Sequence, residues 1–145
     1  MTNLNFTISE LTHSDAAKQY GINNIPDLKA TDNLLRLIVK VLQPLRDKLG
    51  KPMVITSGYR CAKLNTLVGG VANSQHTTGQ AVDFVVNGMD VHNLFEFVRN
   101  SGIMYDQLIE EHSKGKTWVH ISYALKNRRE SLKYVNGKYI KCTQI

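Results

Sequence analysis

The first half of the sequence contains a segment, from about residue 31 to residue 49, whose apolar residues recur at helical spacing. An apolar residue every three or four positions predicts a helix with one face in a hydrophobic core. Thr31 and Asp32 offer an N-cap, and Gly50 suits the C-terminal end. Pro44 is expected to kink or restart this helix, because it has no backbone N–H to donate. The apolar positions are Leu34, Leu35, Ile38, Val41, Leu42, Leu45 and Leu49.

Shorter patterns predict three more helical segments and a set of strands. The helices are expected at residues 14–20, 61–67 and 91–100, the last behind an Asp90 N-cap. Strands are expected at residues 52–56, 80–86, 105–111 and 117–123, with a polar loop at 112–116. Asn136-Gly137 predicts a hairpin between residues 132–135 and 138–142, because this pair supplies both positive φ angles of a type I′ turn.

This order of elements predicts the fold class. Helices followed by hairpin-connected strands indicate an α+β fold, with an antiparallel sheet and helices packed on one face. A chain of 145 residues with 42% hydrophobic content is enough for one domain, residues 1–145, with its own core.

Two predicted strands each carry a polar residue with metal-binding chemistry on the face opposite their apolar residues. Side chains alternate along a strand, so Asp83 lies opposite the Val82 and Phe84 face, and His120 lies opposite its own apolar neighbours. Pairing the two strands would bring Asp83 and His120 together. His76 would arrive from the preceding loop, which Gly79 allows to turn sharply. The alternative is that no metal is bound, so that His76 caps a loop, Asp83 ends a turn and His120 is a core histidine with its hydrogen bonds satisfied.

Three motifs resemble the zinc D-alanyl-D-alanine carboxypeptidase family, which includes many phage endolysins and shares a fold with the hedgehog signalling domain. They are Ser-x-His-x-x-Gly-x-Ala-x-Asp at residues 74–83, Ser-Gly-Tyr-Arg at 57–60 and Trp-Val-His at 118–120. The similarity covers about residues 6–123. It implies that Zn²⁺ is held by His76, Asp83 and His120. Three protein ligands leave a fourth position for water, as in catalytic rather than structural zinc sites.

A zinc hydrolase also needs a carboxylate near the metal to act as general base. If Leu108 points to the core, strand alternation places Glu110 on the core face and Glu111 on the polar face. Relatives carry a glutamate at the end of this strand, which also favours Glu111. The sequence departs from some members that have His, Asp or Glu two or three residues before the last ligand, because Trp118 and Thr117 stand there. The alternative is that Glu111 is a solvated strand-end charge.

Three further residues are expected near the substrate. By resemblance, Arg60 binds substrate or stabilises the oxyanion, as guanidinium geometry suits a carbonyl or carboxylate oxygen; the alternative is a surface ion pair. Ser74 is expected to support either the ligand loop or the substrate. Trp118, on the ligand face of its strand, forms either a pocket wall or ordinary packing. His13, His92 and His112 match no motif and are expected at the surface or in packing.

Charge and composition limit the classes of molecule that the protein is expected to bind. The formal charge of +6 favours polyanions, either a bacterial envelope or nucleic acid, but no nucleic-acid-binding motif is present. No apolar stretch is long enough to span a membrane, and the N-terminus lacks signal-peptide features. The expected location is therefore the cytoplasm until release to the cell wall, or the virion. Cys61 and Cys142 are expected to be unpaired thiols, with a single bridge as the alternative.

The combined prediction is a zinc-dependent peptidase that hydrolyses the peptide stems of bacterial peptidoglycan, in the setting of a phage or prophage lysis enzyme. Both a D-Ala-D-Ala carboxypeptidase and a cell-wall endopeptidase would share these ligands. A non-catalytic zinc-binding domain with a partner-binding role is the main alternative, and a basic nucleic-acid-binding module is the second. A monomer is favoured, although the sequence does not determine the oligomeric state.

Overall fold

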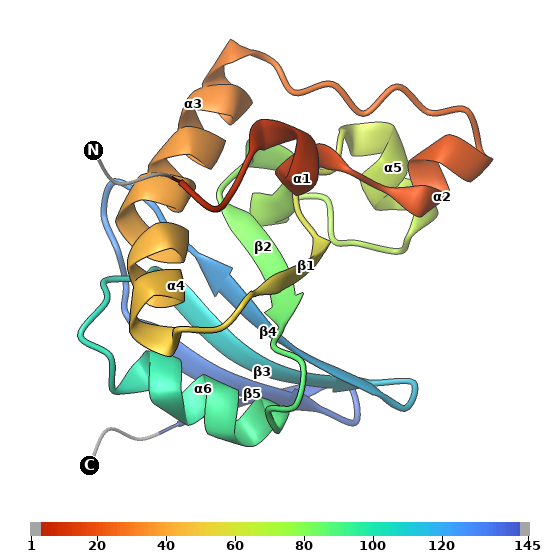
Figure 1. Ribbon diagram of the computed structural model, residues 1–145. Helices are drawn as coiled ribbons and strands as arrows, with labels where there is room; N and C mark the ends of the chain where they lie inside the picture. The colour runs from red at the N-terminus through yellow and green to blue at the C-terminus, as the bar shows by residue number, and fades with distance from the viewer. Residues whose placement is uncertain (1–3, 143–145) are drawn as a thin grey trace.

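The structure, a computed structural model, describes residues 4–142 and consists of a six-stranded sheet with helices around it (Figure 1). The sheet order is β1-β2-β4-β3-β5-β6, so β1 and β6 are its edge strands. The strands are β1 (Val54–Ser57), β2 (Ala81–Val85), β3 (Gln107–Ser113), β4 (Lys116–Ser122), β5 (Glu130–Val135) and β6 (Lys138–Lys141). The helical elements are α1 (Ile8–Thr12), α2 (Asp15–Gln19), α3 (Leu28–Leu37), the π-helical turn η1 (Ile38–Leu42), α4 (Gln43–Leu49), α5 (Ala62–Leu67), the 3₁₀ turn η2 (Gln75–Thr78) and α6 (Val91–Arg99).

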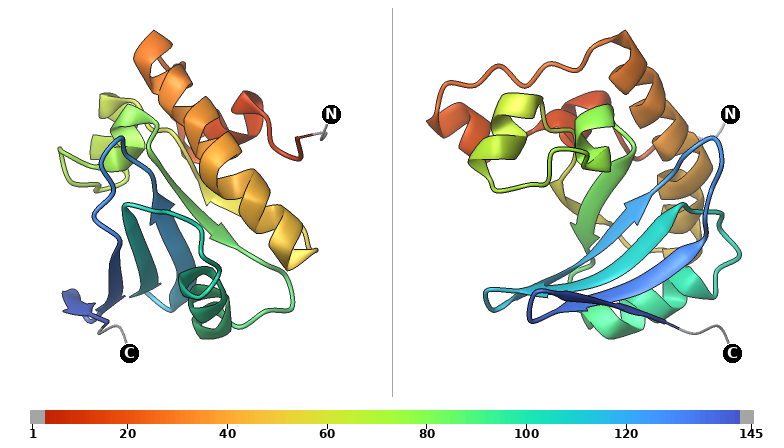
Figure 2. Two further views of the ribbon diagram at one scale, coloured as in Figure 1. Left: turned by 90° about the vertical axis from the view of Figure 1, so that its left-hand side faces the viewer. Right: turned by 180° about the vertical axis from the view of Figure 1, so that it is seen from behind.

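The core lies between one face of the sheet and two helical segments. The continuous α3–η1–α4 segment and α6 lie on the same side of the strands (Figure 2). Apolar side chains from the central strands pack there against apolar side chains from the helices, and all of them are buried. Those from the strands are Val82, Phe84, Leu108, Val119 and Ile121, and those from the helices include Leu34, Leu37, Leu45, Leu94 and Phe95. This agrees with the predicted α+β class, and the sheet face opposite the helices is free for polar chemistry.

The long helix begins earlier than the sequence predicted. Its N-cap is Asp27, not Thr31 or Asp32, and Asp27 Oδ1 accepts a 2.8 Å hydrogen bond from the N–H of Ala30. One more helical turn forms because Asp27 caps as well as the later candidates do. Pro44 lies in the first turn of α4, directly after η1, where the N–H of Gln43 reaches back five residues to Ile38 O, so the helix changes its hydrogen-bond spacing before Pro44 without being interrupted. Gly50 ends the helix with φ of 65°, as predicted.

Two features of the sheet differ from expectation. Residues 112–116 are not a loop, because Lys114 and Gly115 both have positive φ and close a two-residue turn between extended strands. The predicted hairpin at Asn136-Gly137 does form, but it joins the sheet beside β3, and β5 runs parallel to β3. The chain between β4 and β5 crosses to the far side of β3, so one of the pairings is parallel while the others are antiparallel.

Smaller elements match or extend the prediction. The expected helix at residues 14–20 is α2, whose N-cap Ser14 accepts from the N–H of Ala17. The short helix α1 was not predicted from the sequence. Cys61 and Cys142 are free thiols, as expected. Within residues 4–142 no helix has the length and hydrophobicity needed to cross a bilayer.

Candidate metal centre and active site

Three side chains with metal-binding atoms meet on the open face of the sheet. Asp83 on β2 lies directly opposite His120 on β4 in the strand register, as strand alternation predicted. His76 comes from η2, the turn before β2. Asp83 Oδ1 lies 3.0 Å from His120 Nδ1 and 3.3 Å from His76 Nε2. All three residues are buried.

The donor set and its spacing suit a zinc ion. Two imidazole nitrogens and one carboxylate oxygen are zinc ligands, and ligands about 2.0–2.1 Å from a tetrahedral ion lie about 3.3 Å from one another. The two separations from Asp83, 3.3 Å and 3.0 Å, are close to that value, and the three ligand atoms all lie within 4.8 Å of one another. Burial acts to raise the pKa of Asp83, but the two imidazoles outweigh it and hold the pKa well below its ordinary value. A carboxylate that stays ionised is ready to bind a cation.

A backbone carbonyl fixes the orientation of His76. His76 Nδ1 lies 2.8 Å from Gly58 O, and because a carbonyl can only accept, the proton is on Nδ1. The lone pair of Nε2 then faces Asp83 and the metal position, the usual outer support of a metal-binding histidine. Gly58 has no space for a side chain, since a Cβ there would lie 2.0 Å from Leu11 O. The glycine of the Ser-Gly-Tyr-Arg motif therefore serves the ligand loop.

Ser74 and Gly79 shape the turn that carries His76. Ser74 is the N-cap of η2, and its Oγ accepts a 3.2 Å hydrogen bond from the N–H of His76. Gly79 ends the turn with φ of 75°, and a Cβ there would lie 2.4 Å from Ala30 O. Of the two roles expected for Ser74, support of the ligand loop is the one seen in these contacts. Ser74 also lines the cavity described below.

Glu111, rather than Glu110, faces the metal centre. In the sheet register Glu111 lies between Trp118 on β4 and Tyr134 on β5, and its Oε1 is 3.9 Å from His120 Nδ1. Burial, reinforced by the negative charge of Asp83, raises the pKa of Glu111 to about 7, although His120 and Arg60 act in the opposite direction. A carboxylate with such a pKa can accept a proton near neutral pH. A bound dication would lower this pKa.

Glu110 lies on the core face of β3, as alternation predicted, where it has an environment of its own. Its side chain is 3% exposed, and its two oxygens lie 2.8 Å from His92 Nδ1 and 2.6 Å from His112 Nε2. Lys133 Nζ is 3.7 Å away. His92 and His112, which match no motif, thus enclose a buried carboxylate on the side of the sheet away from the metal centre.

Arg60 and Trp118 line the same cavity of about 450 Å³ as the three metal-binding side chains and Glu111. Arg60 Nη1 donates a 3.3 Å hydrogen bond to Asn65 Oδ1. Arg60 Nε and Trp118 Nε1 are buried and have no hydrogen-bond partner among residues 4–142. Burial lowers the pKa of Arg60, while the charges of Asp83 and Glu111 raise it. Arg60 is therefore a cation beside the metal centre, which differs from the surface ion pair considered as the alternative.

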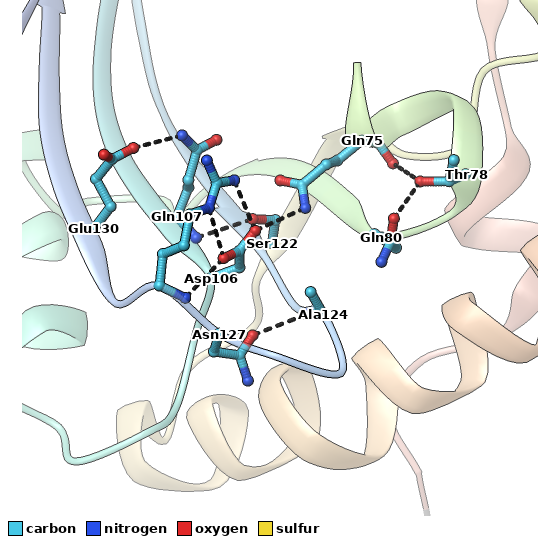
Figure 3. A network of polar contacts seen from close by, with 10 residues as sticks. Gln75, Thr78, Gln80, Asp106, Gln107, Ser122, Ala124, Asn127 and Glu130 are labelled. Atoms are coloured by element: carbon cyan, nitrogen blue, oxygen red, sulfur yellow. Dashed lines mark hydrogen bonds and ion pairs between the residues drawn. The ribbon is translucent and has the colours of Figure 1, made fainter. Parts of the chain in front are cut away.

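Arg128, which the buried Asp106 holds in place, lines a second part of the cavity that sequence reasoning missed. Figure 3 shows Asp106 and Gln75 directed toward each other, and Gln75 Nε2 donates a 2.8 Å hydrogen bond to Asp106 Oδ2. Arg128, 22 residues further along the chain, pairs with the same carboxylate, and Gln75 and Arg128 both line the cavity. No local motif links Asp106 to Arg128, because the pairing depends on the crossing of the chain from β4 to β5.

Comparison with known proteins identifies the family. Residues 4–122 match the peptidase M15 family, and the chain belongs to it. A curated relative, the zinc D-Ala-D-Ala carboxypeptidase of Streptomyces albus G, is 32% identical over 102 residues. This alignment covers 70% of the chain and 39% of the relative, so the chain spans less than half the length of that protein. Family and donor set together identify zinc as the cofactor.

Proposed function

We propose that the protein is a zinc-dependent peptidase that hydrolyses the peptide stems of bacterial peptidoglycan. The observation that carries this proposal is the meeting, in one cavity, of three zinc-type ligands with the carboxylate of Glu111 and a partly buried arginine, Arg60. Membership of the peptidase M15 family supports hydrolysis of a peptide bond. The relative's name supports a substrate related to D-Ala-D-Ala.

The residues of the site divide the work of hydrolysis. His76, Asp83 and His120 would hold the zinc ion, which when bound supplies a Lewis acid and lowers the pKa of a bound water. Glu111 is the general base, placed to take the proton from the attacking water and deliver it to the leaving amine. Arg60 presents a fixed positive charge to the oxygen of the scissile carbonyl, where negative charge develops. Trp118 forms a wall of the substrate cavity.

The setting that best fits this activity is a phage or prophage lysis enzyme, present in the cytoplasm until it reaches the wall or carried in the virion. The basic surface would favour an anionic envelope over neutral polymers. The bond that is cut is either the terminal D-alanyl bond or one inside the stem. The two differ in product, so mass spectrometry of wall fragments after incubation with the protein distinguishes them.

Metal analysis and turnover of matched variants test the proposal. Wild type should contain about one zinc per chain and release stem fragments, and His120→Ala should lose both, because it removes one of three ligands. His13→Ala is the matched control, since His13 is half-exposed and pairs with Asp15 on the surface. Full zinc retention by His120→Ala would remove His120 from the ligand set. A filled zinc site without hydrolysis of any wall fragment would favour the non-catalytic zinc-binding alternative.

A further inference from the structure

A second arginine lies in the metal-site cavity, on the far side of the centre from Arg60 in the strand order. We propose that Arg128 recognises a carboxylate of the substrate, close to the bond that is cut. This inference rests on the proposed function, and it deepens that function by assigning a specificity residue. Its basis is the way Arg128 is held, the hydrogen-bonding edge that remains free, and the position of that edge relative to the metal centre.

A buried carboxylate fixes the position of Arg128. Asp106 is 2% exposed, and its Oδ1 accepts from both the backbone N–H of Arg128 at 2.8 Å and Nε at 2.9 Å. Arg128 Nη2 donates to Asp106 Oδ2 at 2.8 Å, and Gln75 Nε2 donates to the same oxygen. The pKa of Asp106 falls to about 2, mainly through the hydrogen bond from Arg128, so the carboxylate is ionised at all working pH values. A bidentate pair of this kind leaves the guanidinium little freedom to rotate.

The pairing with Asp106 uses only one edge of the guanidinium. Arginine offers five N–H donors in a planar fork, and Asp106 takes the edge formed by Nε and Nη2. The edge formed by Nη1 and Nη2 remains, and within the described part of the chain Nη1 has no hydrogen-bond partner. The Arg128 side chain is 56% exposed and lines the cavity. Glu130, the other acid near Arg128, already accepts from Gln107 Nε2 at 2.6 Å.

The strand register places this free edge at a distance that suits a short peptide. Ile109 lies opposite His120, and Asp106, which holds Arg128, is three residues before Ile109, about 10 Å at 3.3 Å per residue. An extended substrate bound at the metal centre would therefore present a carboxylate to Arg128 from within about three residues of the scissile bond. Peptidoglycan stems offer such a group at the terminal D-alanine and at the α-carboxyl of D-glutamate.

Kinetics on acid and amide substrates test this assignment with the zinc-loaded protein. The substrates are a stem pentapeptide ending in D-alanyl-D-alanine, the same peptide with a terminal amide, and the same peptide with the D-glutamyl α-carboxyl amidated. Arg128→Gln should raise KM for the parent peptide about 10- to 100-fold with kcat largely retained, because a charge-assisted bidentate contact is lost. Arg129→Gln is the matched control, since Arg129 is exposed and absent from the cavity lining.

The amide substrates identify which carboxylate is bound. If Arg128 contacts one of these carboxylates, the peptide in which that carboxylate is amidated should bind wild type as weakly as the parent peptide binds Arg128→Gln. Arg128→Gln should not weaken the binding of that amide peptide any further. An equal rise in KM for all three peptides, or no rise for any, would overturn the inference. Failure of wild type to hydrolyse any of them would instead refute the proposed function. In that event, calorimetric binding of the parent peptide to wild type and Arg128→Gln still tests Arg128.

Discussion

Replacing Glu111 by glutamine should make the metal-free protein more stable while it removes activity. In the unfolded chain Glu111 ionises near its ordinary pKa of 4.5, but in the folded, metal-free protein it ionises near 7. Between these pH values the folded state binds more protons than the unfolded state, so stability falls as pH rises through this range. Above pH 7 Glu111 is ionised in both states, and the free energy of unfolding is lower by about 3 kcal/mol than it would be if the folded protein left the pKa of Glu111 at 4.5.

Glutamine keeps the size of the side chain and carries no charge, so it avoids this cost. Metal-free Glu111→Gln should be about 2–3 kcal/mol more stable than wild type at pH 8, and less than about 1 kcal/mol more stable at pH 5. The difference should shrink in the zinc-loaded protein, because a dication attracts the Glu111 charge. Turnover of stem peptides should fall by roughly 10² to 10⁴ with zinc content retained, since the amide cannot accept the proton.

Urea denaturation of chelator-treated wild type and Glu111→Gln at pH 5 and pH 8 measures the stability difference. Peptide release by the zinc-loaded proteins measures turnover. Glu96→Gln is the control for loss of one negative charge, because Glu96 lies on α6, away from the cavity. A metal-free Glu111→Gln protein that is no more stable than wild type at pH 8 would refute the reasoning about burial and charge. Unchanged turnover would show that another group takes the proton.

Three further substitutions test other parts of the structure. Asp106→Asn should lower the free energy of unfolding by about 1–2 kcal/mol above pH 4, a modest value because Arg128 is half-exposed. Wild type itself loses this stability as the pH falls toward 2, so acid unfolding curves of the two proteins measure the difference. Gly58→Ala should cost about 2 kcal/mol or more and lower zinc affinity, because a Cβ would displace Leu11 O and the carbonyl that orients a ligand; a chelator competition titration measures the affinity. Glu110→Gln should lower the free energy of unfolding by about 1–3 kcal/mol, because it disturbs the hydrogen bonds to two histidines, while the protein keeps one zinc per chain. Thermal unfolding measures this difference, and equal stability of the two proteins would contradict it.

The ligand set was predicted from motif resemblance, and the meeting of two of its members could be predicted from local patterns in the sequence. Asp83 and His120 sit in strands whose apolar alternation fixes the polar face, so their meeting required only that the two strands pair. The choice of Glu111 over Glu110 rested on the same alternation, with Leu108 facing the core, and on the resemblance to relatives that carry a glutamate at the end of this strand. These inferences depend on side-chain periodicity within single strands, which the sequence contains.

Other parts of the site depend on contacts between distant segments, which periodicity does not report. The position of β5 beside β3 is set by how the chain crosses after β4, and the Asp106–Arg128 pair follows from that crossing. Gly58 is required because Leu11 O packs against it, and α1 was not predicted at all. The helix start was misplaced for a different reason, since Asp27, Thr31 and Asp32 are all competent caps and only packing selects among them.

The exposed strand β6 has a consequence for self-association. It is the last strand of the sheet within residues 4–142, and Tyr139 and Ile140 on it are 62% and 52% exposed. An apolar edge of this kind is a template for pairing with the same edge of another copy, the first step of aggregation. Lys138 and Lys141 flank the two apolar residues and oppose such pairing by charge repulsion. Part of the basic excess therefore opposes pairing between copies at this edge, and high salt, by screening the lysines, would weaken that protection.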